Sequence, residues 1–147
     1  MEEEITSPVG NVLNGYYKNA AVGASAIDSL LDTVTDKNFR KELFYQREYY
    51  EHQKQNLTSQ LAEYYQLPVK QGTMAKFWTD FTIRMRKLKG IDVHQAARLM
   101  AEGTNMGMIQ LHQVINENPD IPDEIRQQGK KILSHEREYL DRITPYL

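Results

Sequence analysis

Apolar side chains recur at alternating steps of three and four residues along most of the chain, and this spacing constrains the fold more than any other feature. The first such run is Leu13, Tyr16, Ala20, Gly23, Ile27, Leu30 and Val34. In an α-helix these positions share one face, as they do in the helices of a bundle. Similar runs occupy roughly residues 38–65, 92–118 and 122–143, and no segment alternates as a strand would. The pattern therefore predicts four long amphipathic helices, the first over residues 8–34.

The connections between these helices predict how they are arranged. Ser7 and Pro8 are typical of a helix start, and Pro122 is suited to the first turn of the last helix. Short segments join the first helix to the second and the third to the fourth, so each pair should form an antiparallel hairpin. The middle connection, residues 66–91, is long and contains a shorter amphipathic pattern over 74–89. We expect it to cross along one side of the bundle, which would leave the second and third long helices parallel.

Composition excludes several classes of function. The chain has 147 residues and no cysteine, which excludes thiol chemistry, thiolate metal sites and disulfides and suits a reducing compartment. A net charge of -2 gives no overall basic field that would attract nucleic acid. The sequence shows no secretory signal and no apolar run long enough to span a membrane. We predict a cytoplasmic protein with an acidic tail over residues 1–7 and a single helical domain over 8–147.

Two glycines, Gly103 and Gly107, lie inside the third predicted long helix, where each costs about 1 kcal/mol relative to alanine. The first and third long helices carry small residues at their middles, whereas the second and fourth carry Tyr50 and Tyr139 at a similar level. Bundle cores fill by setting large residues against small ones. We therefore expect the glycines to make room for tyrosine rings or for close helix approach, with a ligand cavity as the alternative.

The order of the helices, the long crossover and several stretches of sequence resemble the ferritin-like superfamily. Within it, the chain is similar to small bacterial four-helix-bundle proteins that lack the di-iron motif. The stretches are YYKNAAVGASAIDSLL, KELFYQREYY, QGTMAK, AEGTNMG and EREYLDRITPYL. This resemblance implies an all-α, ferritin-like four-helix bundle with a fifth, shorter crossover helix between the second and third long helices.

Catalytic members of that superfamily take a carboxylate from each of two helices and a Glu-x-x-His pair from each of the other two. This chain has no Glu-x-x-His pair, so we predict no catalytic residue, no metal centre and no cofactor. Glu136 nevertheless falls on the seam of the last helix, where a carboxylate is costly unless it is hydrogen-bonded. We favour a polar network with Gln46, Gln53 or a tyrosine hydroxyl, or exposure near a frayed end of the core. The alternative is a residual metal site formed by His135, Glu136 and Glu51.

The predicted crossover helix is basic on one face and apolar on the other. Between residues 70 and 89 six lysines and arginines accompany a single acid, Asp80. We favour an apolar face that covers the side of the bundle, with the charges in solvent. A surface that contacts a partner or an anionic membrane through Trp78, Arg84, Arg86 and Lys87 is the alternative. Nucleic acid is disfavoured because the aromatic residues and the charges lie on opposite faces.

These features predict a non-enzymatic structural or interaction protein. We expect it to self-associate through an exposed part of a long helix, with a dimer as the favoured homo-oligomer. A metal-binding ferritin-like protein with a non-standard ligand set is one alternative. A peripheral membrane or partner-docking module that acts through residues 74–89 is the other.

Overall fold

The computed structural model describes residues 7–64 and 75–147, with side chains from residue 79 onward in the second range. In these residues every regular element is helical, as predicted. The α-helices are α1 (Pro8–Leu31), α2 (Lys37–Glu63), α3 (Ala75–Arg86), α4 (Val93–Asn116) and α5 (Asp123–Ile143), and the 3-10 helix η1 (Thr144–Tyr146) follows them. None of these helices is both long and apolar enough to cross a membrane.

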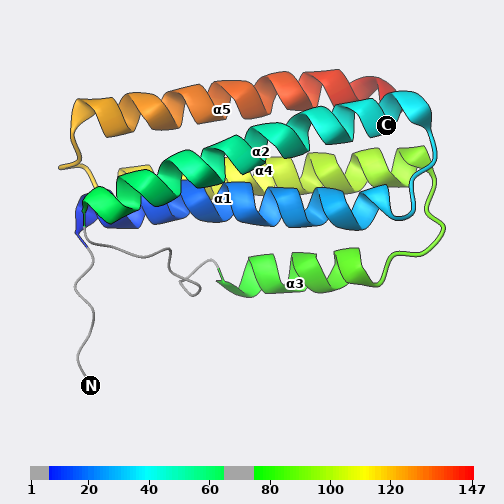
Figure 1. The fold of residues 1–147 in the computed structure, drawn as a ribbon, viewed down its shortest axis with the longest axis horizontal. Helices are drawn as coiled ribbons and strands as arrows, with labels where there is room; N and C mark the ends of the chain where they lie inside the picture. Colours follow the sequence, from blue (N-terminus) through cyan, green and yellow to red (C-terminus); the bar gives the residue numbers. More distant parts are fainter. Residues whose placement is uncertain (1–6, 65–74) are drawn as a thin grey trace.

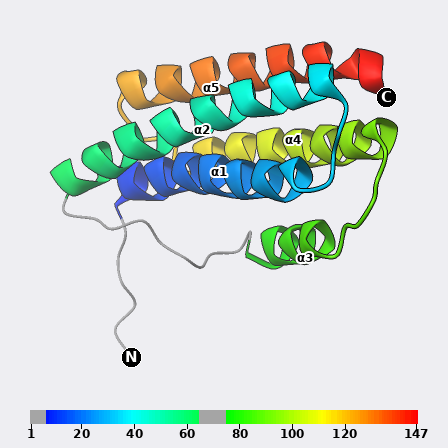
Figure 2. The same ribbon diagram turned by 45° about the vertical axis from the view of Figure 1, so that its right-hand side comes forward.

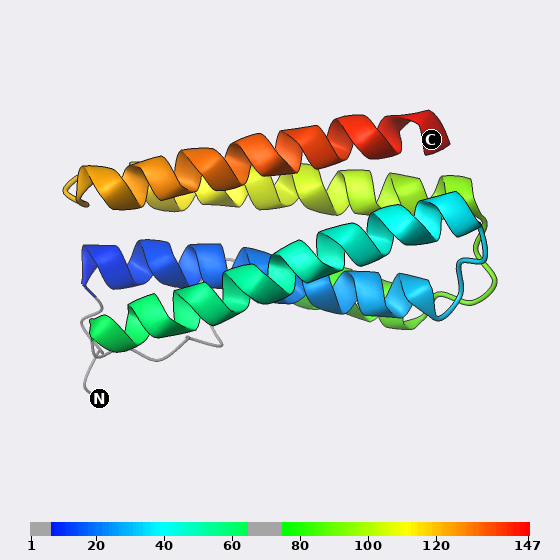
Figure 3. The ribbon, with the colours of Figure 1, turned by 45° about the horizontal axis from the view of Figure 1, so that its top comes forward.

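The four long helices lie side by side, with α3 on the outside of the bundle (Figure 1). α1 and α2 run in opposite directions, and so do α4 and α5, which confirms the two predicted hairpins (Figures 1 and 2). α2 and α4 run in the same direction, as expected of a crossover connection. α2 lies obliquely across α1 and approaches α5 near the C-terminus (Figure 3). α1 contacts all four of the other α-helices and is the central element of the fold.

Polar side chains define where the helices begin. Ser7 Oγ accepts a hydrogen bond of 3.0 Å from the Gly10 amide, and Pro8 fits the first turn because it needs no amide partner there. Asp36 caps α2 through the Phe39 amide. At the start of α4, Asp92 and Gln95 satisfy each other's backbone amides in a capping box. The first helix ends at Leu31, a few residues before the predicted end.

The core consists of two hydrophobic clusters, one toward each end of the bundle. One cluster combines the C-terminal half of α1 with the first half of α2, the start of α4, the end of α5 and α3. The other combines the first turns of α1 with the end of α2, the end of α4 and the start of α5. Leu61 is the last fully buried residue of α2, and Tyr64, which lies within the segment 38–65 predicted for the second helix, is 38 % exposed. The buried core therefore stops before the end of that predicted segment.

Aromatic rings fill the space above several helical glycines. A Cβ atom on Gly23 would overlap the Tyr50 ring, which confirms the pairing of a lean first helix with a tyrosine-bearing second helix. At Gly103 the prediction of a tyrosine was wrong, since a Cβ atom there would lie 2.7 Å from the Phe81 ring of α3. The cause is that the crossover helix, and not a long helix, covers this part of α4. Gly107 is buried as expected.

The apolar face of α3 packs against the bundle. Phe81 and Met85 are at least 96 % buried in the cluster that also contains Ala97 and Met100 of α4. The favoured prediction, that this face covers the side of the bundle, is confirmed for these residues. The side chain of Trp78 lies outside the described residues.

Candidate functional site

A layer of buried polar side chains separates the two hydrophobic clusters. Each long helix contributes to it: Asn19 from α1, Tyr50 from α2, Thr104 from α4 and Glu136 from α5. In α1, α4 and α5, these residues fall between the positions that enter one cluster and those that enter the other. The layer thus lies at the centre of the molecule, and its buried polar side chains make it the candidate functional site.

Glu136 is the acid of this layer and is 1 % exposed. Its Oε2 atom accepts a hydrogen bond of 2.9 Å from the Tyr50 hydroxyl, and its Oε1 atom accepts one of 3.4 Å from Asn19 Nδ2. Burial raises the pKa of Glu136 to about 7, although both hydrogen bonds act to lower it. The predicted network with a tyrosine hydroxyl is confirmed, whereas exposure near a frayed end is wrong.

The phenols around Glu136 remain neutral. Burial, and then the charge of Glu136, raises the pKa of Tyr50 well above its usual range. The same two causes raise the pKa of Tyr49 and of Tyr139. A phenol with a raised pKa keeps its proton. The carboxyl group of Glu136 is therefore surrounded by neutral phenols, of which Tyr50 donates to it, and no ion pair among the described residues involves Glu136.

His135 belongs to a separate contact on the edge of this layer. Its ring stacks on Tyr49 with the ring centroids 3.4 Å apart, and its Nε2 atom donates to Gln46 Oε1 at 3.0 Å. Burial, and then the charge of Arg142, lowers the pKa of His135. Gln46 thus pairs with His135, and of the partners proposed for Glu136 it is a tyrosine hydroxyl, that of Tyr50, that binds the carboxyl group.

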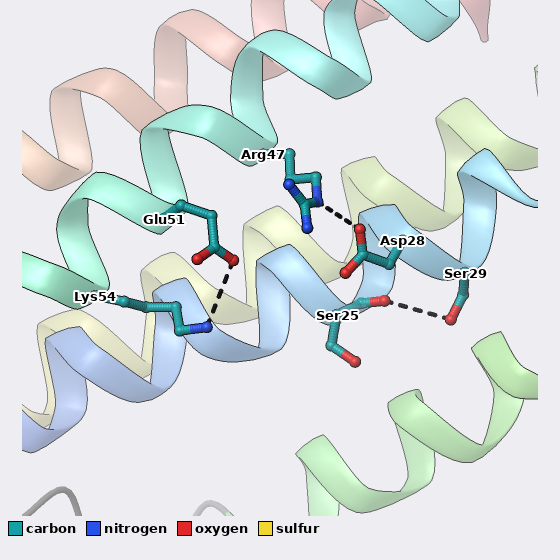
Figure 4. Close-up of polar contacts among 6 residues, drawn as sticks. All are labelled: Ser25, Asp28, Ser29, Arg47, Glu51 and Lys54. Atoms are coloured by element: carbon teal, nitrogen blue, oxygen red, sulfur yellow. Dashed lines mark hydrogen bonds and ion pairs between the residues drawn. The ribbon is translucent and has the colours of Figure 1, made fainter.

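The alternative metal site at His135, Glu136 and Glu51 does not form. Glu51 follows Tyr50 by about 100° around the helix, so it points away from the buried layer and pairs with Lys54 Nζ at 3.5 Å (Figure 4). Nowhere in residues 7–64 and 79–147 do three or more histidine, aspartate or glutamate side chains come together as a metal would require.

A small pocket adjoins the polar layer beside Gly103. It is lined by Asn19, Gly23, Tyr50, Phe81, Gly103 and Thr104, among others, and has room for about 20 Å³. That is enough for a water molecule and far below the roughly 300 Å³ of a typical ligand pocket. The alternative that the glycines open a cavity for an organic ligand is therefore not supported. The Thr104 hydroxyl has no hydrogen-bond partner within the described part of the chain.

Several charged residues of α1, α2, α3 and α4 form salt bridges on the bundle surface. Glu102 pairs with Arg84 of α3 at 3.6 Å and with Arg98 at 3.3 Å, so Arg84 joins the crossover helix to α4. Arg86 and Lys87 are exposed. Arg47 of α2 pairs with Asp28 of α1 (Figure 4). The charged side chains described from residue 79 to residue 87 are in solvent or paired, as the favoured prediction required.

Among the described side chains, the most exposed aromatic residues lie on the outer face of α2, and sequence reasoning did not single them out. Phe44 is 52 % exposed and Tyr45 is 68 % exposed. The Arg40 guanidinium lies 5.7 Å from the Phe44 ring, and that of Arg142 lies 5.5 Å from the Tyr45 ring. Both aromatic residues lie outside the apolar face of α2. This position in the sequence pattern could have identified them as exposed aromatic side chains.

Comparison of the chain with models of protein families, with curated proteins and with solved structures finds no match. The fold and the polar layer are therefore interpreted from the geometry of this molecule. The likeness to ferritin-like proteins rests on helix order and sequence stretches alone.

Proposed function

We propose that this chain is a ferritin-like four-helix bundle that works as a non-enzymatic structural or interaction protein and self-associates. The helix directions support the bundle type, because two antiparallel hairpins are joined by a long crossover that leaves α2 and α4 parallel (Figure 1). The polar layer takes one side chain from each long helix.

The observation that carries the proposal is the pairing of both Glu136 oxygens with donors of the same chain. Tyr50 and Asn19 occupy the two oxygens, and the carboxyl group shares the layer with neutral side chains. A buried carboxyl group with satisfied hydrogen bonds contributes to packing specificity and is not presented to a ligand. The Glu136 carboxyl group thus holds its own helices together, which favours the surface as the part that acts.

Self-association is supported by the outer face of α2. Two large aromatic side chains that are more than half exposed lie next to each other on one helix. Aromatic and arginine side chains are the residues that contribute most to protein interfaces. Both types occur together on the exposed side of α2, where Arg40 lies over Phe44 and Arg142 lies over Tyr45.

Light scattering of the purified protein over a wide concentration range tests self-association, and we expect a mass above that of one chain. A strict monomer at high concentration would contradict the proposal. Metal analysis of protein made without a histidine tag, with iron and manganese supplied during growth, tests the metal-binding alternative. Stoichiometric metal that disappears in the Glu136→Gln variant would establish that alternative.

A further inference from the structure

The charges on α2 are divided between a basic half, defined here as residues 37–47, and an acidic half, residues 48–63. Apart from Glu42, which pairs with Arg142 at 3.2 Å, the charged residues of the basic half are lysines and arginines, and those of the acidic half are glutamates apart from Lys54, which pairs with Glu51. The basic residues are Lys37, Arg40, Lys41 and Arg47, and the acidic ones are Glu48, Glu51 and Glu63. In the described part of the chain no ion pair neutralises Lys37, Lys41, Glu48 or Glu63, and all four are exposed.

The exposed face of α2 also has a shape that could receive another helix. A shallow, open groove follows the middle of the helix and is lined by Phe44, Arg47, Glu48, Glu51, His52 and Gln55. Tyr45 stands beside this groove and is 68 % exposed. At about 1.5 Å per residue, a helix of 27 residues offers a face about 40 Å long.

We infer that a second copy of this chain packs its α2 antiparallel against this face, as a two-fold symmetric dimer. The inference rests on the proposed self-association and names the surface that carries it. In an antiparallel pair the basic half of each α2 lies on the acidic half of the other, whereas a parallel pair would bring like charges together. A two-fold interface requires a surface that is complementary to itself, and this division of charge provides it.

The positions of the exposed residues define the register of this dimer. With the two-fold axis level with residue 50, Lys37 of one copy lies opposite Glu63 of the other, and Glu48 lies opposite His52. Tyr45 of each copy then lies opposite Gln55 of the other, which lines the groove. These residues follow one another at helical spacing along a single stripe, so the contacts can form together.

Paired charge reversals test this arrangement. The variant Lys37→Glu/Lys41→Glu makes both halves of α2 acidic, and the variant Glu48→Lys/Glu63→Lys makes both halves basic. We expect each variant alone to dissociate at least tenfold more readily than the unmodified chain in sedimentation velocity. An equimolar mixture should regain the dimer, because one copy of each kind restores the attraction.

The matched control is Lys130→Glu/Lys131→Glu, which makes the same change of charge at exposed positions of α5 and should leave association unchanged. Circular dichroism confirms that each variant is folded. If the unmodified chain associates but neither variant weakens it, or if mixing restores nothing, the α2 interface is wrong and self-association stands. If the unmodified chain is a monomer throughout, both the interface and the proposed function are wrong.

Discussion

The Tyr50 hydroxyl donates a hydrogen bond of 2.9 Å to Glu136 Oε2 and thereby connects α2 to α5 across the middle of the bundle. Both residues are at least 97 % buried. Neither can exchange this bond for one to solvent, so breaking it leaves a buried polar group unsatisfied.

Replacing Tyr50 with phenylalanine should destabilise the protein by about 1–3 kcal/mol, because it leaves a buried carboxyl oxygen without its donor. Urea denaturation followed by circular dichroism measures the change. Tyr45→Phe removes a hydroxyl group from the same helix at a position that is 68 % exposed, and should change the free energy of unfolding by less than 0.5 kcal/mol, roughly the usual surface effect. Equal effects of the two substitutions would show that the Tyr50–Glu136 bond contributes nothing.

Stability should fall as the pH rises from about 4.5 toward 7. Burial raises the pKa of Glu136 from 4.5 in the unfolded chain to about 7 in the folded one, so the folded state holds its proton over an interval in which the unfolded state has lost it. The loss amounts to about 3 kcal/mol and is complete above the folded pKa. Urea unfolding at a series of pH values measures it.

Glu136→Gln provides the comparison for this pH dependence, since glutamine resembles the protonated acid and does not titrate. The difference in free energy of unfolding between the unmodified chain and the variant isolates Glu136 from every other titrating group. That difference should move in favour of the variant between pH 4.5 and 7. A difference that stays constant with pH would mean that Glu136 titrates alike in the folded and unfolded states.

Gly103→Ala should destabilise the protein by about 1–3 kcal/mol, although alanine is the better helix former by about 1 kcal/mol. The added methyl group would lie 2.7 Å from the Phe81 ring, and the ring is fixed in the core. Thermal unfolding measures the cost. In a double-mutant cycle with Phe81→Leu, the second substitution should recover part of the loss, because it removes the ring that the methyl group meets. Additive effects would indicate that α3 does not pack on α4 in this way.

The protein should not float with anionic vesicles, because the apolar side chains described on this face of α3 are packed on the bundle. Phe81 and Met85 of α3 are buried, and Arg84 is paired with Glu102. A flotation assay with phosphatidylserine-containing vesicles measures this. Binding that is lost on charge reversal at Arg84, Arg86 and Lys87 would contradict the prediction and favour a peripheral membrane module.

The helices and their directions could be predicted because apolar periodicity and loop length are local properties of the sequence. Glu136 could be recognised as a seam acid for the same reason. Its partners could not be identified, because Gln46, Gln53 and several tyrosines were equally placed on the neighbouring seam and only the relative rotation of the helices distinguishes them. The Phe81 ring that packs on Gly103 was not predicted, because it lies on α3. The apolar pattern of the long helices does not specify where α3 packs. Phe44 and Tyr45 were not predicted, because the apolar pattern identifies buried positions and does not indicate which exposed residues could act at the surface.

The polar layer also fixes the axial alignment of α1, α2 and α5. A slip of any one of these three helices by a turn, about 5.4 Å, would move its polar group into an aliphatic cluster and break a hydrogen bond to Glu136. Aliphatic residues alone would tolerate such a slip far better, since one leucine replaces another at little cost. Glu136 and its donors therefore favour a single axial alignment of these helices over alignments that are shifted by one turn.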